Sequence, residues 1–159
     1  MNHRHRTRHR VQRPCRPTEF GSYAALAWPR LLRTAHLLTG DPAEADALAR
    51  TALSDAYARW RRIPDNDTDF YVRRLLVRRH LGHRLGRRPR PRHAVPAPQA
   101  PLTGALAALP ARQRVVLVLR LGEKLGRLEI AEMLGWSVGA VKSYERRGLK
   151  ALGQVADEA

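Results

Sequence analysis

The chain has 159 residues, which allow one ordinary domain or two small ones. Its 30 Lys and Arg against 14 Asp and Glu give a net charge of +16, and such an excess binds polyanions through counterion release, so nucleic acid is the default partner. An anionic membrane surface is the rival partner, but we find neither an apolar run of about 18 residues nor a signal-peptide core. The single Cys15 excludes an internal disulfide and indicates no thiolate metal site. We therefore expect a soluble, cytoplasmic protein without membrane association.

Residues 1–18 are predicted to be a disordered basic arm. The first 17 residues contain six Arg and three His with almost no apolar side chain, so burial cannot repay the entropy of ordering them. The favoured interpretation is a solvated tail or a tail that makes peripheral contacts with DNA. Metal binding by the interleaved His is the alternative, and the neighbouring positive charges oppose it.

Three amphipathic helices are predicted between residues 19 and 88, together forming a small bundle. The first ends at Thr39 and Gly40, and Pro29 is placed near its first turn. Asp41 caps the second helix, which begins at Pro42 and runs to about residue 62, and Asp69 caps the third after a turn at 63–69. The apolar positions at helical spacing in the first two helices are Leu26, Leu31, Leu32, Ala35, Leu38, Ala45, Leu48, Ala49, Ala52, Leu53, Ala56, Tyr57 and Trp60.

The third helix opens a strongly basic stretch. Residues 71–92 contain nine Arg and no acidic residue, which is either a solvated face or a surface for an anionic ligand. Mutual repulsion of uncompensated like charges favours the ligand. Residues 89–101 contain five Pro and are predicted to be a semi-rigid linker between two helical domains.

Residues 102–155 carry the pattern of a helix-turn-helix domain. Thr103 is expected to cap a short helix, and Pro110 starts a buried helix that ends at Gly122. A helix at 127–134 ends at Gly135, which can take the left-handed conformation of a tight turn, and Ser137 then caps the last helix. The positions expected in the core are Val115, Val116, Leu117, Val118, Leu119, Leu121, Ile130, Ala131, Leu134, Val141, Leu149 and Leu152.

The last helix is predicted to lie in the major groove of DNA. Lys142, Ser143 and Arg146 would reach base edges or phosphates, while Arg147 and Lys150 would contact the backbone. Basic residues late in a helix also suit the helix dipole, so their charge alone decides little. The combination with a glycine turn and a serine cap indicates DNA binding.

Six segments carry a family resemblance. They are WPRLLRTAHLLTGD at 28–41, TALSDAYARW at 51–60, YVRRLLV at 71–77, LPARQRVVLVLR at 109–120, EIAEMLGWSVGAVKS at 129–143 and RGL at 147–149. In this order they resemble bacterial RNA polymerase sigma factors of the extracytoplasmic-function group, sigma-70 family, in particular a sigma-E-like type common in actinobacteria. The resemblance implies an all-helical chain of two small domains. Residues 19–88 would bind the polymerase core clamp and minus-10 promoter DNA, and residues 102–155 would bind minus-35 promoter DNA.

The resemblance also assigns site residues. The minus-35 set is Ser137, Ala140, Lys142, Ser143, Arg146, Arg147 and Lys150, and Glu129 falls at a family motif position. The minus-10 set is Arg73, Arg74, Arg78, Arg79, His80, His83 and Arg84. The polymerase-binding set is Asp46, Leu48, Arg50 and Leu53.

Several positions depart from the family pattern. Ala47 and Arg50 replace an acid and an amide, Arg78 replaces an Asn, and His83 and Arg84 stand where aromatic residues are usual. A second hypothesis therefore keeps the fold but describes a degenerate sigma-like DNA-binding regulator that does not melt promoters. Tyr144 and Arg146 replace smaller polar residues on the last helix, which indicates a different target sequence.

Catalysis is not expected. The sequence has no Gly-rich phosphate loop, no Cys or His cluster at metal spacing and no nucleophile paired with a base. We therefore predict no catalytic residue, metal, cofactor or small-molecule substrate. An inhibitory anti-sigma protein stays open as a further partner.

Overall fold

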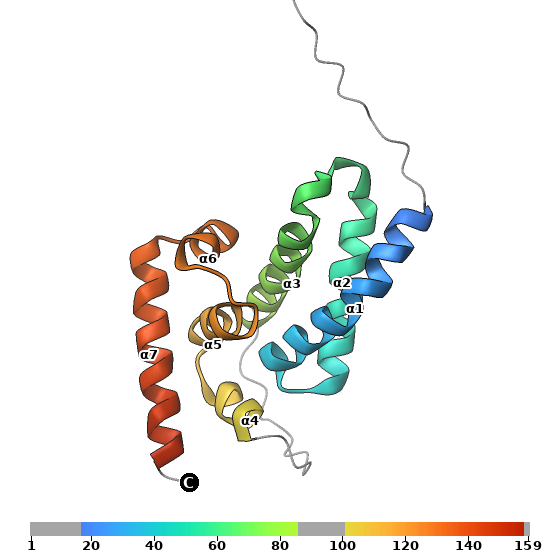
Figure 1. Cartoon of the computed structure of the whole chain (residues 1–159). Coiled ribbons are helices and arrows are strands. Elements are labelled where there is room, and N and C mark those ends of the chain that lie inside the picture. The colour runs from blue at the N-terminus through green and yellow to red at the C-terminus, as the bar shows by residue number, and fades with distance from the viewer. Residues whose placement is uncertain (1–16, 86–100, 158–159) are drawn as a thin grey trace, which may run out of the picture.

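The computed structural model describes residues 17–85 and 101–157, and within these ranges it contains helices and no strand. The first half comprises α1 (Pro17–Thr39), α2 (Pro42–Ala58) and α3 (Thr68–Leu85), with the 3-10 turns η1 (Trp60–Arg62) and η2 (Asp65–Asp67) between the last two (Figure 1). The second half comprises α4 (Pro101–Ala108), α5 (Ala111–Leu117), the π-helical turn η3 (Val118–Gly122), α6 (Arg127–Leu134) and α7 (Val138–Asp157). The all-helical class is confirmed. Most of the predicted arm (1–18) and linker (89–101) lies outside the described residues.

Helix α1 is longer than predicted, and its inward stripe is different. Pro29 lies in the middle of the helix and not near its first turn. The expected core residue Leu26 is 84% exposed, so that prediction is wrong, and Ala27 takes the buried position in front of Leu31. No helix among the described residues is long and apolar enough to cross a membrane.

Helix α2 begins as predicted and packs closely on α1. The Asp41 carboxylate accepts a hydrogen bond from the Glu44 backbone N–H at 2.8 Å, and Pro42 occupies the first turn. The inward face consists largely of small residues, which let the two helix backbones approach each other. Its fully buried alanines are Ala45, Ala49, Ala52 and Ala56.

Aromatic side chains pack the end of α2 and the following turn η1 against the start of α1. The Phe20 ring lies 5.0 Å from the Tyr57 ring and 5.1 Å from the Trp60 ring, and Trp60 also packs on Tyr23. Tyr57 is exposed, so it belongs to this surface cluster and not to the core expected for it.

The start of α3 is tied to α1 by a charged side chain. Asp69 lies inside the first turn of α3 and does not cap it, contrary to prediction. Its carboxylate accepts a hydrogen bond from the Tyr23 hydroxyl at 3.0 Å and pairs with the Arg30 guanidinium at 2.8 Å. Burial alone would raise the pKa of the Asp69 carboxyl, but the hydrogen bonds from Arg30 and Tyr23 outweigh burial and lower that pKa.

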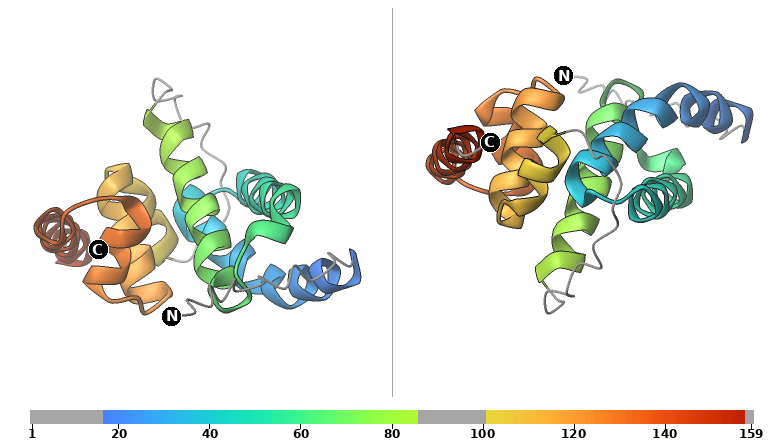
Figure 2. Two further views of the ribbon diagram at one scale, coloured as in Figure 1. Left: turned by 90° about the horizontal axis from the view of Figure 1, so that it is seen from above. Right: turned by 90° about the horizontal axis from the view of Figure 1, so that it is seen from below.

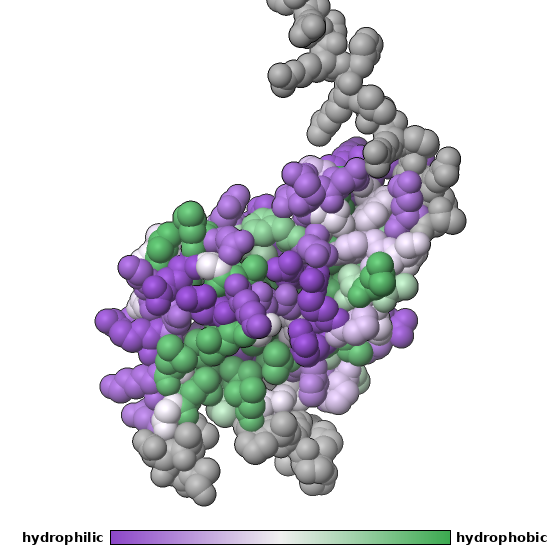
Figure 3. Space-filling view, in the orientation of Figure 1, coloured by the Kyte–Doolittle hydropathy of each residue, from purple (hydrophilic) through white to green (hydrophobic). Residues whose placement is uncertain are grey.

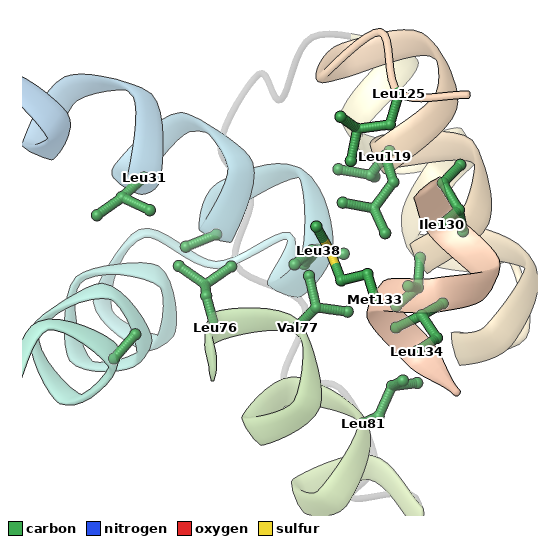
Figure 4. Close-up of a cluster of buried hydrophobic side chains, with 14 of the residues drawn as sticks. Leu31, Leu38, Leu76, Val77, Leu81, Leu119, Leu125, Ile130, Met133 and Leu134 are labelled. Atoms are coloured by element: carbon green, nitrogen blue, oxygen red, sulfur yellow. The ribbon is translucent and has the colours of Figure 1, made fainter. Parts of the chain in front are cut away.

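The two halves share one hydrophobic core. Helix α3 lies between α2 on one side and α5 and α6 on the other, as both views in Figure 2 show. Side chains from the two halves meet between them, with Met133 of α6 pointing toward Leu38 of α1 and Val77 of α3 (Figure 4). All three side chains are fully buried. The first and second halves are therefore packed against each other by apolar burial.

A buried guanidinium reinforces this contact. Arg114 of α5 is only 4% exposed and donates hydrogen bonds to the backbone carbonyls of Leu38 at 2.7 Å, Ala107 at 2.6 Å and Leu109 at 3.0 Å. Leu38 lies in the last turn of α1, whose carbonyls have no partner within the helix. One side chain therefore links the end of α1 to the turn between α4 and α5.

Two predictions for α4 and η3 are wrong. Thr103 lies buried inside α4 and does not cap it, because the helix begins two residues earlier. Leu121 is 58% exposed, since the π turn η3 changes the helical register after Leu117. The remaining predicted core residues of α5 and η3, from Val115 to Leu119, are buried.

Candidate nucleic-acid interface

The helix-turn-helix forms as the sequence predicts. Helix α6 ends at Gly135, whose φ of 69° places it in the left-handed region. The Ser137 hydroxyl then accepts a hydrogen bond from the Ala140 N–H at 3.1 Å and caps α7. At the other end of α6, the Glu129 carboxylate accepts a hydrogen bond from the Gly126 N–H at 2.6 Å, so this motif position has a structural role.

Helix α7 lies at one edge of the molecule (Figure 1), and basic residues follow one another along it. Lys142, Arg146, Arg147 and Lys150 are exposed, and Ser143 is half-buried beside them. Ser137 is exposed and Ala140 half-buried at the start of the helix. The predicted minus-35 residues therefore gather on one helix, with its small residues at the N-terminal end.

The inward face of α7 differs from the prediction. Leu149, expected in the core, is 46% exposed, whereas Val141, Glu145 and Gly148 are buried and Leu152 is half-buried. Gly148 meets α5 closely, because a side-chain carbon added there would lie 2.8 Å from Leu117 Cδ1. Glu145 and Gly148 thus occupy buried positions of α7, although hydrophobicity predicts both residues to lie on the surface.

Two side-chain networks that hold α7 in place were not predicted from the sequence. The Glu145 carboxylate pairs with Arg127 Nε at 2.6 Å and with Arg120 Nε at 3.3 Å. On another side of the helix, the Tyr144 hydroxyl accepts a hydrogen bond from Arg112 at 3.2 Å and its ring lies 5.4 Å from that of Trp136. The acid four positions after the core residue Val141 is the signal in the sequence that could have indicated the first network.

The predicted minus-10 surface on α3 is only partly open. Arg73 is largely covered and pairs with Glu123 at 3.7 Å, and Glu123 also accepts a hydrogen bond from the buried Thr34. His80 is buried, contrary to its predicted place on the basic face. Arg79 is exposed and pairs with Asp55 at 2.6 Å.

Two more α3 cations complete that surface. Arg74 is half-buried, and the exposed Arg78 approaches the helix-turn-helix, since a side-chain carbon added at Gly135 would lie 3.8 Å from Arg78 Nη2. The basic stretch is therefore partly compensated by acids from α2 and from the residue after η3, so the expected uncompensated cluster is wrong for this part of α3. The side chains of His83 and Arg84 lie outside the described part.

The predicted polymerase-binding residues divide between surface and core. Asp46 and Arg50 form an ion pair at 2.6 Å, and the Arg50 guanidinium lies 5.3 Å from the centre of the Trp28 ring. Leu48 is half-buried, whereas Leu53 is buried in the core, so its side chain is not on a surface in this structure. Within the described residues, no group of three or more His, Cys, Asp and Glu is placed to hold a metal ion.

One face of the molecule carries both hydrophilic and hydrophobic areas (Figure 3). Figure 3 shows hydrophilic side chains across its middle and a hydrophobic area at the lower left, over α4 and the adjoining end of the second half. The exposed large hydrophobic side chains of the second half include Leu102 of α4 and Leu149 of α7.

Comparisons with known proteins agree with this geometry. The family described as sigma-70, region 4 matches residues 99–152, which include α6, the turn and α7 as far as Leu152. The chain is 33% identical over 148 residues to the RNA polymerase sigma-E factor of Streptomyces coelicolor, covering 84% of each chain. It is 34% identical over 151 residues to the RNA polymerase sigma-E factor of Streptomyces avermitilis, covering 84% of this chain and 83% of that one.

Solved structures share the fold. The sigma factor RpoE of Bartonella quintana, solved with the anti-sigma factor NepR, superposes with a TM-score of 0.72 at 17% identity, covering 88% of this chain and 98% of that one. CnrH, solved with the cytosolic domain of CnrY, gives a TM-score of 0.69 at 20% identity and 90% coverage of both chains. The sequence identity to the Streptomyces factors, over most of both chains, shows the family. The chain belongs to the RNA polymerase sigma factors of the sigma-70 family, in its extracytoplasmic-function group.

Proposed function

We propose that the protein is a promoter-specificity subunit that binds RNA polymerase core and directs transcription initiation in the cytoplasm, without bond chemistry of its own. The observation that carries the proposal is the capped helix α7, which exposes Lys142, Arg146, Arg147 and Lys150 within the matched region 99–152. Membership of the sigma factor family supports initiation over the alternative of a degenerate regulator.

Helix α7 reads the minus-35 element in this proposal. Exposed Arg and Lys contacts to phosphates supply affinity that falls with salt, because each contact releases condensed counterions. Lys142 and Arg146 supply specificity, since a bidentate contact to a base discriminates against a wrong base by about 1–3 kcal/mol.

The first half binds polymerase and minus-10 DNA in this proposal. Asp46 and Arg50 belong to the polymerase-binding surface in this proposal, and their ion pair on α2 lies beside the Trp28 ring of α1. Arg74, Arg78 and Arg79 are the minus-10 contacts that are exposed or half-buried, and Arg79 also pairs with Asp55. Arg73 reaches DNA only after its contact with Glu123 in the second half is broken.

An anti-sigma protein is included in the proposal as a regulatory partner. The support is the structural likeness to a sigma factor that was solved in complex with its anti-sigma factor NepR. Binding across both halves would hold them in the packed arrangement seen here.

Co-purification and transcription test the proposed function. The full chain is expected to co-purify with RNA polymerase core and to direct run-off transcription from a subset of fragments of its own genome. An Asp46→Ala, Arg50→Ala variant tests the polymerase-binding surface, because it removes an ion pair whose side chains are 70% and 42% exposed for Arg50 and Asp46 and leaves the core of α2 intact. Absence of both core binding and transcription for the natural sequence would contradict the proposal.

Replacement of Arg146 should change base preference, whereas loss of basic residues from the arm should not. An Arg146→Ala variant is expected to bind its promoter about 5–150-fold more weakly and to relax preference at one base position. Replacing Arg4, Arg6, Arg8 and Arg10 with Ala should weaken cognate and random DNA about equally and flatten the salt dependence. Fluorescence anisotropy at several salt concentrations measures both effects. Equal effects of the two changes on cognate and random DNA would contradict the assignment of Arg146.

A further inference from the structure

Glu145 is a buried charge on the DNA-reading helix. The residue is 7% exposed, although its neighbours Arg146 and Arg147 are exposed. Burial of an ionised carboxylate is costly unless partners compensate the charge. Glu145 meets that condition by pairing each of its two oxygens with a different guanidinium, Oε2 with Arg127 and Oε1 with Arg120.

The two partners come from separate elements of the second half. Arg127 is the first residue of α6, and Arg120 lies in the π turn η3 and also donates a hydrogen bond to the Leu125 carbonyl at 3.1 Å. The carboxylate therefore connects α7 to the start of the preceding helix and to the turn that leads into it. Without the negative charge, two guanidinium groups would be left facing the same site.

Tyr144 restrains the same helix from a different direction. Successive residues of an α-helix point about 100° apart, so Tyr144 and Glu145 contact different neighbours. Tyr144 reaches Arg112 at the start of α5, and its ring packs on Trp136 in the turn before α7. Contacts on two sides of one helical turn resist rotation of α7 about its own axis more strongly than either contact alone.

We propose that Glu145 is a positioning residue that fixes the rotation of α7 and so sets which bases Lys142 and Arg146 reach. The inference rests on the proposed function, because it concerns how the minus-35 helix discriminates between sequences. Arg146 follows Glu145 directly and Lys142 precedes it by less than one turn, so a rotation of α7 displaces both tips. Recognition needs side chains within about 10–20° of their productive direction.

A charge-matched pair of variants separates positioning from net charge. Glu145→Gln and Glu132→Gln each remove one negative charge, but Glu132 is exposed on α6. The probes are a DNA duplex selected from a random pool by the natural full-length chain and a scrambled duplex of equal composition. Glu145→Gln is expected to lower the ratio of selected to scrambled affinity about tenfold, the scale of one lost base contact, while Glu132→Gln leaves the ratio unchanged.

A second variant tests whether a folding defect explains the effect of Glu145→Gln. Arg127→Gln removes a partner whose side chain is 44% exposed, and it should lower the same ratio in the same direction. In the double variant with Glu145→Gln the ratio should fall by less than the product of the two single effects, because both changes break the Glu145–Arg127 ion pair. Thermal unfolding by circular dichroism checks that each variant is folded.

Three results would overturn the inference. An unchanged ratio in both Glu145→Gln and Arg127→Gln would show that Glu145 does not position α7. Equal weakening of both duplexes together with a lower unfolding midpoint would show a merely structural role. If the natural chain selects no duplex at all, the proposed function fails as well, so the two failures are distinguishable.

Discussion

An Arg114→Ala variant is expected to lose about 3–5 kcal/mol of unfolding free energy, because removal of one partner leaves buried carbonyl groups without their hydrogen bonds. Three carbonyls, those of Leu38, Ala107 and Leu109, accept from this single guanidinium. The change also leaves a cavity where the side chain crossed between the halves, and packing around it relaxes only partly. Urea denaturation followed by circular dichroism measures the loss.

A surface arginine provides the control for Arg114. Arg33→Ala removes the same side chain from an exposed position of α1 and is expected to change the unfolding free energy by less than about 0.5 kcal/mol. An Arg114→Lys variant should remain strongly destabilised, since an ammonium group cannot reproduce the planar fork of donors. A loss for Arg114→Ala no larger than for Arg33→Ala would show that the buried hydrogen bonds do not stabilise the fold.

A Gly148→Val variant is expected to lose about 1–3 kcal/mol of stability through overpacking, and to bind promoter DNA more weakly. The first added carbon would lie 2.8 Å from Leu117 Cδ1 and 3.1 Å from Leu117 Cγ, and Leu117 is itself 1% exposed. Helix α7 must then move away from α5, which disturbs the contacts of Glu145 and Tyr144 as well. Urea denaturation and fluorescence anisotropy measure the two effects.

Gly153 lies later on the same helix and serves as the matched control. A side-chain carbon added there meets nothing within 4 Å, so Gly153→Val should leave stability and DNA binding close to those of the natural chain. If Gly148→Val behaves like Gly153→Val, then Leu117 yields to the new side chain and the close approach of α5 and α7 is not required.

Local signals predicted the helices and the helix-turn-helix well. Asp41 and Ser137 act as the caps that their side chains suggested, and Gly135 takes the left-handed conformation that a tight turn requires. These features depend on residues within one helical turn of each other, which the sequence displays directly. The α6 core residues Ile130, Ala131 and Leu134 were predicted for the same reason.

Long-range contacts explain most of the errors. Hydrophobicity predicted that Leu149 is buried and Glu145 exposed. Glu145 is buried instead, because two arginines from other elements compensate the charge of its carboxylate. The nine-arginine stretch looked uncompensated because Asp55 and Glu123, which pair with Arg79 and Arg73, lie 24 and 50 positions away in the chain. Composition cannot show which distant acids the fold brings to a basic helix.

The packing of α3 and the end of α1 against the second half also sets a thermodynamic condition on the binding of partners. A ligand that binds only when the halves are apart has its apparent dissociation constant multiplied by the inverse of the fraction of molecules that are apart. Met133, Leu38 and Val77 make that fraction small by burying apolar surface together. Substitutions that loosen this contact would therefore tighten such binding without touching a single residue of the binding surface.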